Sequence, residues 1–165
     1  MSRYQLDDTD KKILSILQKD GRIANNKLAE KVGLTTTPTL ERVKRLEREG
    51  VIKGYGAQVD PEAVEKGLVV FCSLRLAVHK MNTLDEVCSE IDELTEIQAC
   101  YHITGDADFL LKIVVKDMPA YERFVHDKLT QLQGIERIYS NIVMSTKKEN
   151  YHLPINEDHH EESKI

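Results

Sequence analysis

Residues 25–50, NNKLAEKVGLTTTPTLERVKRLEREG, decide the fold of the N-terminal part of this chain. The stretch contains two short amphipathic helix patterns, and Gly33 is predicted to end the first, because the residue after a helix commonly adopts a positive φ. Thr35 is predicted to cap the second helix through its hydroxyl. Apolar side chains recur at helical spacing along the second helix: Leu40, Val43 and Leu46. A glycine turn followed by a helix rich in arginine and lysine is typical of a helix-turn-helix DNA-binding motif.

Charge is distributed unevenly along the chain. The 165 residues carry a net charge of −5, but residues 1–56 sum to +4 and the remainder to −9. Contact with DNA phosphates needs only a locally positive surface, so the acidic average does not exclude binding to nucleic acid. The length suits one medium domain or two small ones.

Several functional classes lack their sequence signatures. There is no run of about 18 apolar residues and no signal-peptide core, which predicts a soluble cytoplasmic protein without a membrane partner. Cys72, Cys88 and Cys100 show no C-x-x-C spacing, so we interpret them as free thiols in a reducing compartment. No glycine-rich phosphate loop, zinc-ligand spacing or nucleophile motif is found, so we expect no enzyme, no cofactor and no metal site.

The N-terminal helices need a cover for their shared apolar side. A first helix is predicted over residues 6–20, with Asp7 or Asp8 as its cap. Residues 51–57, VIKGYGA, are rich in β-forming residues and glycine and follow the basic helix directly. We interpret them as the strand pair, or wing, of a winged helix-turn-helix domain that covers residues 1–59.

A different pattern begins after a predicted linker at residues 60–67. The predicted strands are residues 68–78, 97–104, 108–115 and 135–145, and the predicted helices are residues 83–94 and 117–134. The order β-α-β-β-α-β is typical of a ferredoxin-like α+β domain, here residues 68–146, with helices on one face of an antiparallel sheet. The uncovered apolar face predicts association with a second copy. Residues 147–165 are polar and lack periodicity, which predicts a mobile tail.

The basic helix and its flanks supply the candidate DNA-binding side chains. Short hydroxyl side chains at its N-terminus are suited to base edges or phosphates: Thr35, Thr36, Thr37 and Thr39. Two arginines are suited to a guanine edge or a phosphate: Arg42 and Arg45. Three more cations are candidates for backbone contact: Lys44, Arg48 and Lys53. The alternative is a solvated helix laced by salt bridges, such as one between Glu41 and Arg45.

The loop at residues 104–109, TGDADF, is a second candidate site. In the structural interpretation, Gly105 supplies a positive φ and an aspartate makes an Asx turn. In the functional interpretation, backbone N–H groups and the carboxylates of Asp106 and Asp108 form a small polar pocket that receives an ammonium group. The spacing alone favours the structural interpretation.

Both halves of the chain resemble one known family. Residues 6–55, LDDTDKKILSILQKDGRIANNKLAEKVGLTTTPTLERVKRLEREGVIKGY, resemble the DNA-binding part of the leucine-responsive and asparagine-responsive transcription regulators, the Lrp/AsnC family. Residues 102–124, HITGDADFLLKIVVKDMPAYERF, and 134–144, GIERIYSNIVM, resemble its ligand-sensing domain. The resemblance covers about residues 4–155. One departure is Thr35-Thr36, where the family often has Ser-Pro.

The resemblance implies winged helix-turn-helix regulators that dimerise through their C-terminal sheets and often assemble into octamers. It also implies a small effector, usually an amino acid, bound between dimers near the loop that joins the second and third sensing strands. Carried over to this sequence, the candidate effector-binding residues are His102, Ile103, Thr104, Gly105, Asp106, Asp108, Met118, Tyr121, Arg137, Tyr139 and Ser140.

The sequence thus predicts a sequence-specific transcriptional regulator in the bacterial or archaeal cytoplasm, associated with the nucleoid. Its expected partners are double-stranded DNA, further copies of itself and an amino-acid effector. Two alternatives stay open. One is an architectural DNA-binding protein that responds to no effector. The other is an enzyme like the sirohaem decarboxylases, which resemble this family in fold but act on a tetrapyrrole and need basic and imidazole groups around a large pocket.

Overall fold

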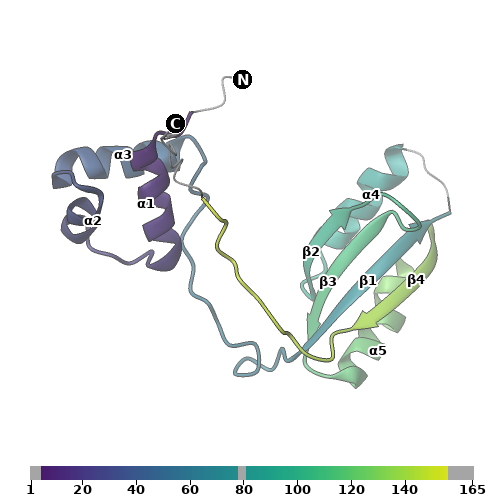
Figure 1. Ribbon diagram of the computed structural model, residues 1–165. Helices are drawn as coiled ribbons and strands as arrows, with labels where there is room; N and C mark the ends of the chain where they lie inside the picture. The colour runs from purple at the N-terminus through teal and green to yellow at the C-terminus, as the bar shows by residue number, and fades with distance from the viewer. Residues whose placement is uncertain (1–4, 78–80, 156–165) are drawn as a thin grey trace, which may run out of the picture. The chain divides into compact units, whose positions relative to one another are not determined.

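The structure is a computed structural model that describes residues 5–77 and 81–155, with only the backbone described for residues 81–85. The chain divides into two compact units. The first comprises the residues up to Gln58 together with the segment that starts at Glu149, and the second comprises Val59–Lys148 (Figure 1). Within the described ranges, no helix has the length and apolarity needed to cross a membrane.

Three helices form the first unit: α1, Asp8–Lys19; α2, Asn25–Val32; and α3, Thr36–Arg48. Helix α1 begins with a capping box, in which Asp7 and Asp10 each accept a hydrogen bond from the backbone N–H of the other. Gly33 ends α2 with a φ of 75°, as predicted. The helices share a buried apolar core: Ile13, Leu14, Leu28, Val32, Val43 and Leu46. The predicted helix-turn-helix is therefore confirmed.

The beginning of α3 differs from the prediction. Thr35 occupies the capping position, but its hydroxyl makes no capping hydrogen bond. Instead, the Thr39 hydroxyl donates to the carbonyl oxygen of Thr35 at 2.9 Å, and Thr39 is fully buried. A threonine inside a helix commonly bonds back to the carbonyl four residues earlier. This bond does not satisfy the first N–H groups of α3, so the helix begins without a side-chain cap.

The predicted strand pair at residues 51–57 is wrong, because this segment contains no β-strand. The N–H groups of Val51 and Ile52 both donate to the carbonyl oxygen of Leu46, at 2.9 and 3.1 Å. Gly50, with a φ of 70°, turns the chain so that these groups close the end of α3. Backbone amides used in this way are not available to a sheet.

Part of the segment that the sequence assigns to a mobile tail lies against α1. The Gln18 side-chain amide donates to the carbonyl oxygen of Leu153 at 3.1 Å, and the N–H of Leu153 donates to Gln18 Oε1 at 2.7 Å. Ile155 packs against the apolar core of the helices. Residues 149–155 thus belong to the first unit, and residues 156–165 lie outside the described residues.

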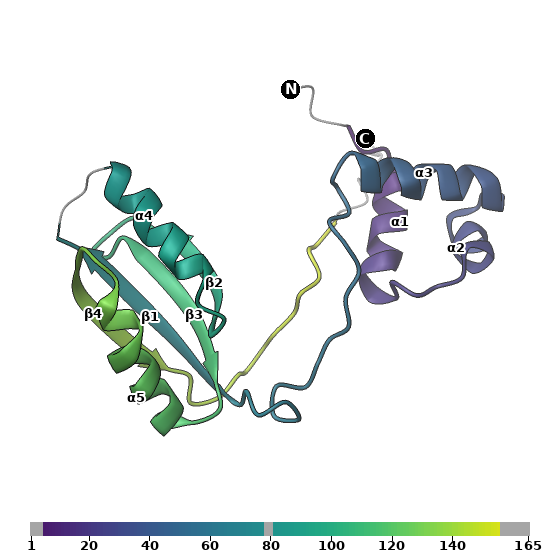
Figure 2. The same ribbon diagram turned by 180° about the vertical axis from the view of Figure 1, so that it is seen from behind.

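The second unit is a four-stranded sheet with α4 and α5 on one face; Figure 2 shows both helices in front of the sheet. Its elements are β1, Leu68–Leu76; α4, Met81–Asp92; β2, Ile97–His102; β3, Phe109–Val115; α5, Met118–Asp127; and β4, Ile135–Ile142. The strand order is β2-β3-β1-β4, and all neighbouring strands are antiparallel. The predicted ferredoxin-like α+β fold is confirmed.

The helix predicted over residues 117–134 is interrupted. Asp117 caps α5 by accepting a hydrogen bond from the N–H of Ala120 at 2.9 Å. Lys128 then leaves helical geometry, with a φ of −124°, so α5 ends at Asp127. A short 3-10 helix, η1, Leu129–Gln131, follows it.

Side chains alternate between the two faces of the sheet. The helix-covered face of β1 and β3 is fully apolar: Val70, Cys72, Leu74, Leu76, Phe109, Leu111, Ile113 and Val115. The opposite face, which we call the open face, carries a mixture of apolar and polar side chains: Phe71, Ser73, Tyr101, Leu110, Lys112, Val114 and Tyr139. The predicted uncovered face is therefore present.

The contact between Gln18 and Leu153 can be tested by Gln18→Ala. The variant removes both hydrogen-bond partners of the Leu153 backbone, so hydrogen exchange in peptides covering residues 149–155 should accelerate several-fold, while the melting temperature falls only slightly. Hydrogen-exchange mass spectrometry measures this. Lys19→Ala, on the exposed neighbour, is the control, and equal exchange in both variants would contradict the contact.

Candidate nucleic-acid interface and ligand-binding region

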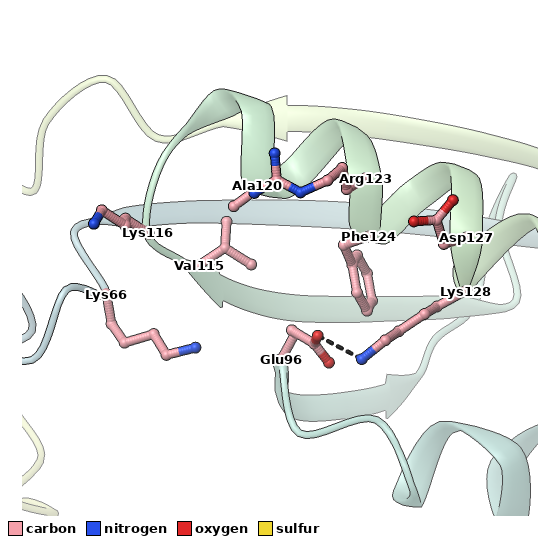
Figure 3. A pocket seen from close by; sticks show the side chains of 9 residues that line it. All are labelled: Lys66, Glu96, Val115, Lys116, Ala120, Arg123, Phe124, Asp127 and Lys128. Carbon is pink, nitrogen blue, oxygen red and sulfur yellow. Dashed lines mark hydrogen bonds and ion pairs between the residues drawn. The ribbon is translucent and has the colours of Figure 1, made fainter.

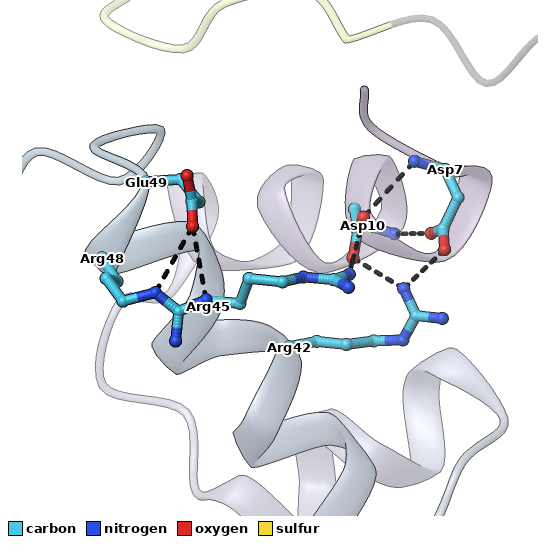
Figure 4. A network of polar contacts seen from close by, with 6 residues as sticks. All are labelled: Asp7, Asp10, Arg42, Arg45, Arg48 and Glu49. Atoms are coloured by element: carbon cyan, nitrogen blue, oxygen red, sulfur yellow. Dashed lines mark hydrogen bonds and ion pairs between the residues drawn. The ribbon is translucent and has the colours of Figure 1, made fainter. Parts of the chain in front are cut away.

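A buried carboxylate joins α3 to α1. Asp10 is fully buried, and Arg42 Nη1 donates to its Oδ1 at 2.8 Å and to Asp7 Oδ2 at 2.6 Å. Arg45 Nη2 lies 3.3 Å from both oxygens of Asp10 (Figure 4). The hydrogen bonds to Asp7 and then to Asp10 raise the pKa of Arg42 above its ordinary value, so this guanidinium stays charged.

Three of the predicted DNA-contacting residues have contacts inside the unit. Arg42 and Arg45 lie against α1, with side-chain exposures of 27% and 38%, and do not extend freely toward a partner. Thr39 is fully buried. Arg42 and Arg45 join α3 to α1 through Asp10, whereas the Thr39 hydroxyl bonds to the Thr35 carbonyl oxygen at the start of α3. Direct contact of these three residues with bases or phosphates stays a prediction.

The outer side of α3 retains part of the predicted DNA-binding set. Exposed side chains from that set are Thr35, Thr36, Thr37, Lys44, Arg48 and Lys53. The first N–H groups of α3 add positive potential at its N-terminus. Arg48 contacts the carboxylate of Glu49 at 3.3 Å but is 71% exposed. Glu41 and Glu47 are also exposed, so the outer side of α3 is not uniformly basic.

Helix α2 carries two exposed cations outside the predicted DNA-binding set. Lys27 and Lys31 are exposed on α2. In helix-turn-helix proteins the first helix of the motif crosses the DNA backbone. That rule, applied to the basic residues of α2, would have found them.

The two aspartates of the loop between β2 and β3 differ in their contacts. Asp108 Oδ2 accepts a hydrogen bond from the N–H of Leu76 at 2.8 Å, and its backbone bonds to Leu74 and Ile103 at 2.9 Å. Asp108 therefore ties the ends of three strands, and its expected role as an ammonium partner stays a prediction. Asp106 is exposed, beside Gly105 with a φ of 117°.

The other candidate effector residues lie in different parts of the unit. His102 stacks near Phe109, with ring centroids 5.4 Å apart, at the end of β2. Met118 follows Val115, at the opposite end of β3 from the loop. Arg137 Nη1 donates to the Tyr139 hydroxyl at 3.3 Å on the open face. A single chain thus does not gather the candidates into one pocket.

Tyr121 and Ser140 satisfy each other beneath α5. Their hydroxyl oxygens are 2.5 Å apart, and Tyr121 is only 5% exposed. Burial is the main cause that raises the pKa of Tyr121 to about 12. This pair fastens α5 to β4 within one chain.

Comparison with known proteins assigns both units. The family described as winged helix-turn-helix DNA-binding matches residues 6–53, and the Lrp/AsnC ligand binding domain matches residues 69–153. The chain belongs to the Lrp/AsnC family. This Lrp/AsnC protein is a DNA-binding transcriptional regulator with a ligand-binding domain, and the resemblance noted from its sequence is confirmed.

Individual relatives cover nearly the whole Lrp/AsnC chain. It is 41% identical over 150 residues to leucine-responsive regulatory proteins of Klebsiella pneumoniae and Escherichia coli K12, covering 91% of this chain and 92% of each relative. A transcriptional regulator from Neisseria meningitidis, solved with L-Met, superposes with a TM-score of 0.87 at 34% identity, covering 92% of this chain and 98% of that one. An AsnC family transcriptional regulator from Agrobacterium tumefaciens superposes with a TM-score of 0.86 at 37% sequence identity. The match covers 90% of this chain and 97% of that one.

The network around Asp10 predicts that Arg42→Met destabilises the DNA-binding unit. The variant leaves a buried carboxylate with fewer donors, so the free energy of unfolding should fall by about 1–3 kcal/mol. Arg48→Met, whose partner Glu49 is exposed, should change it by less than about 0.5 kcal/mol. Urea unfolding measures both, and equal losses would show that Asp10 does not depend on Arg42.

Proposed function

We propose that this Lrp/AsnC regulator binds specific sites on double-stranded DNA as a homo-oligomer, and that an amino acid alters this binding by altering the assembly. The observation that carries the proposal is the combination of an exposed α3 N-terminus in one unit with an uncovered sheet face in the other. The first supplies a DNA contact, and the second supplies a surface for a second copy.

In the proposed DNA contact, Thr36 and Thr37 meet base edges at the N-terminus of α3, where the helix enters the major groove. Phosphates are held by the exposed hydroxyl and cationic groups around it: Thr35, Lys44, Arg48, Lys53, Lys27 and Lys31. Arg42 and Arg45 contribute indirectly, because their bonds to Asp10 set the direction of α3.

In the proposed assembly, two copies pair through their open faces. Phe71, Leu110 and Val114 are only half-buried in the single chain, and the tyrosines Tyr101 and Tyr139 are 52% and 51% exposed. An uncovered sheet face that carries half-buried apolar and exposed aromatic side chains is typical of homodimer interfaces. Dimers then associate further, up to the octamer that the family resemblance implies.

In the proposed effector site, the exposed loop around Asp106 receives the ammonium group of an amino acid. Two observations support this: the Neisseria meningitidis relative is described as a complex with L-Met, and Asp106 is the exposed carboxylate of the loop. Since the candidate residues of one chain lie apart, the site is completed by another copy. The amino acid then acts by binding one assembly better than another.

We also propose that the protein works in the bacterial or archaeal cytoplasm at the nucleoid, as a regulator without enzymatic activity and without a cofactor. The family match supports this. In addition, His102 and His126, which the structure describes in the second unit, are exposed and lie on different elements, whereas a tetrapyrrole decarboxylase needs imidazoles around one large pocket.

Lys44→Ala should weaken DNA binding without weakening the fold. With genomic fragments selected by the unaltered protein as the probe, loss of one phosphate contact should lower affinity severalfold or more and reduce the slope of log K against log salt by about 1. Fluorescence anisotropy at several salt concentrations measures this. The matched control is Lys12→Ala, because Lys12 is exposed on α1. Equal DNA affinity and equal salt dependence in the two variants would show that Lys44 does not belong to the interface.

Asp106→Asn removes the carboxylate charge at nearly constant size. It should leave basal DNA affinity unchanged while abolishing the effect of L-leucine and L-methionine on oligomer mass, measured by light scattering after size exclusion. Glu90→Gln, exposed on α4, is the control. A full response in Asp106→Asn would exclude this carboxylate from the site. Indifference of the unaltered protein to all twenty amino acids would instead favour the architectural alternative.

A further inference from the structure

A pocket of about 330 Å³ lies in the ligand-binding unit, separate from the loop around Asp106. Its lining comes from the segment before β1, the residue before β2, the end of β3, and α5 with the residue after it. The lining residues are Lys66, Glu96, Val115, Lys116, Ala120, Arg123, Phe124, Asp127 and Lys128 (Figure 3). None of these residues belongs to the predicted effector site. The volume is at the lower end of the range for small-molecule sites, so it suits a ligand of amino-acid size.

The pocket has an apolar floor between charged ends. Val115 and Phe124 form the floor, each only 3% exposed, and Ala120 is half-buried beside them. In Figure 3 the Phe124 ring lies beside the Glu96–Lys128 ion pair, and Val115 lies on the side toward Lys116. A ligand with a short aliphatic chain can lie on this floor, which favours binding mainly by removing the ligand's own apolar surface from water.

The charges around the pocket favour an anion. Four cations and two anions line it, which gives a net charge of +2. Lys128 Nζ binds Glu96 Oε1 and Lys116 Nζ binds Glu65 Oε1, each at 2.6 Å, while Asp127 binds His126 at 2.7 Å. The side chains of Lys66 and Arg123 make no hydrogen bond or ion pair with the described residues, so both can hold a carboxylate.

One carboxylate oxygen in the pocket lacks a donor. Glu96 Oε2 is buried and accepts no hydrogen bond within the described chain, although Lys66 extends its ammonium group toward this residue (Figure 3). Burial acts to raise the pKa of Glu96. The hydrogen bond from Lys128, a backbone hydrogen bond and the charges of Lys128 and Lys66 together outweigh burial and leave the pKa below its ordinary value, so the side chain is ionised at neutral pH. A buried anionic oxygen of this kind is normally satisfied by an N–H or O–H group.

We propose that this pocket binds a small aliphatic carboxylic acid with a hydrogen-bond donor on its α-carbon, that is, an α-amino or α-hydroxy acid. The ligand carboxylate lies between Lys66 and Arg123, the donor reaches Glu96 Oε2, and the aliphatic chain covers Phe124 and Val115. This is a second ligand site, independent of the loop around Asp106 and of DNA binding.

Calorimetry on the intact chain with four probes that share one aliphatic chain tests this proposal. L-leucine and L-2-hydroxy-4-methylpentanoate carry both the carboxylate and the donor, 4-methyl-2-oxopentanoate lacks the donor, and 3-methylbutylamine lacks the carboxylate. All titrations use the Asp106→Asn background, so that the loop site does not contribute. At least one of the first two probes should bind with a Kd below about 1 mM, and the last two should bind at least tenfold more weakly.

Variants then locate the binding. Lys66→Ala and Arg123→Ala, both on exposed side chains, should each weaken the binding probe about tenfold. Lys147→Ala, an exposed cation elsewhere in the same unit, should leave it unchanged. Comparison of leucine with its hydroxy analogue identifies the donor as ammonium or hydroxyl.

Three results would overturn the proposal: no binding by either donor-bearing acid, equal binding by the oxo acid, or binding that is unaffected by Lys66→Ala and Arg123→Ala. A failure of the loop site would leave these outcomes unchanged, because the background already lacks the Asp106 carboxylate. The two sites are therefore tested separately.

Discussion

The DNA-binding unit depends on the carboxylate of Asp10, which is fully buried and accepts hydrogen bonds from Arg42 and Arg45. A buried charge is costly unless it is paired and hydrogen-bonded, so α1 and α3 must keep the geometry that brings these groups together. The same carboxylate takes part in the capping box of α1. The surface that α3 offers to DNA is consequently defined by the side chains that this network leaves outside.

In the ligand-binding unit, two aspartates of one loop also differ in their contacts. Asp108 and Asp106 lie two residues apart, yet Asp108 binds the N–H of Leu76 and joins strand ends, whereas Asp106 is exposed. The strand ends held by Asp108 give the loop a fixed base. A loop on a fixed base can present a carboxylate in a defined position, which is what recognition of a small ligand requires.

Periodicity predicts the helices and the order of the strands because each depends on residues that are close in sequence. The partners of Arg42 and Arg45 could not be predicted in this way, since Asp10 lies more than 30 residues earlier and meets them only in the folded core. The strand pair expected at residues 51–57 fails for a different reason: its first amides close the end of α3. Likewise, composition does not distinguish Asp106 from Asp108, because hydrogen bonding to another strand decides their roles.

The contact between Gln18 and Leu153 also has a topological meaning. The chain leaves the DNA-binding unit after Gln58 and re-enters it at Glu149, so the ligand-binding unit is an insertion within the DNA-binding unit. The DNA-binding unit is therefore built from two stretches that are distant in sequence, and it is complete only when residues 149–155 have joined the three helices. Bringing such distant stretches together closes a long loop, which costs conformational entropy that the contacts of Leu153 and Ile155 help to offset.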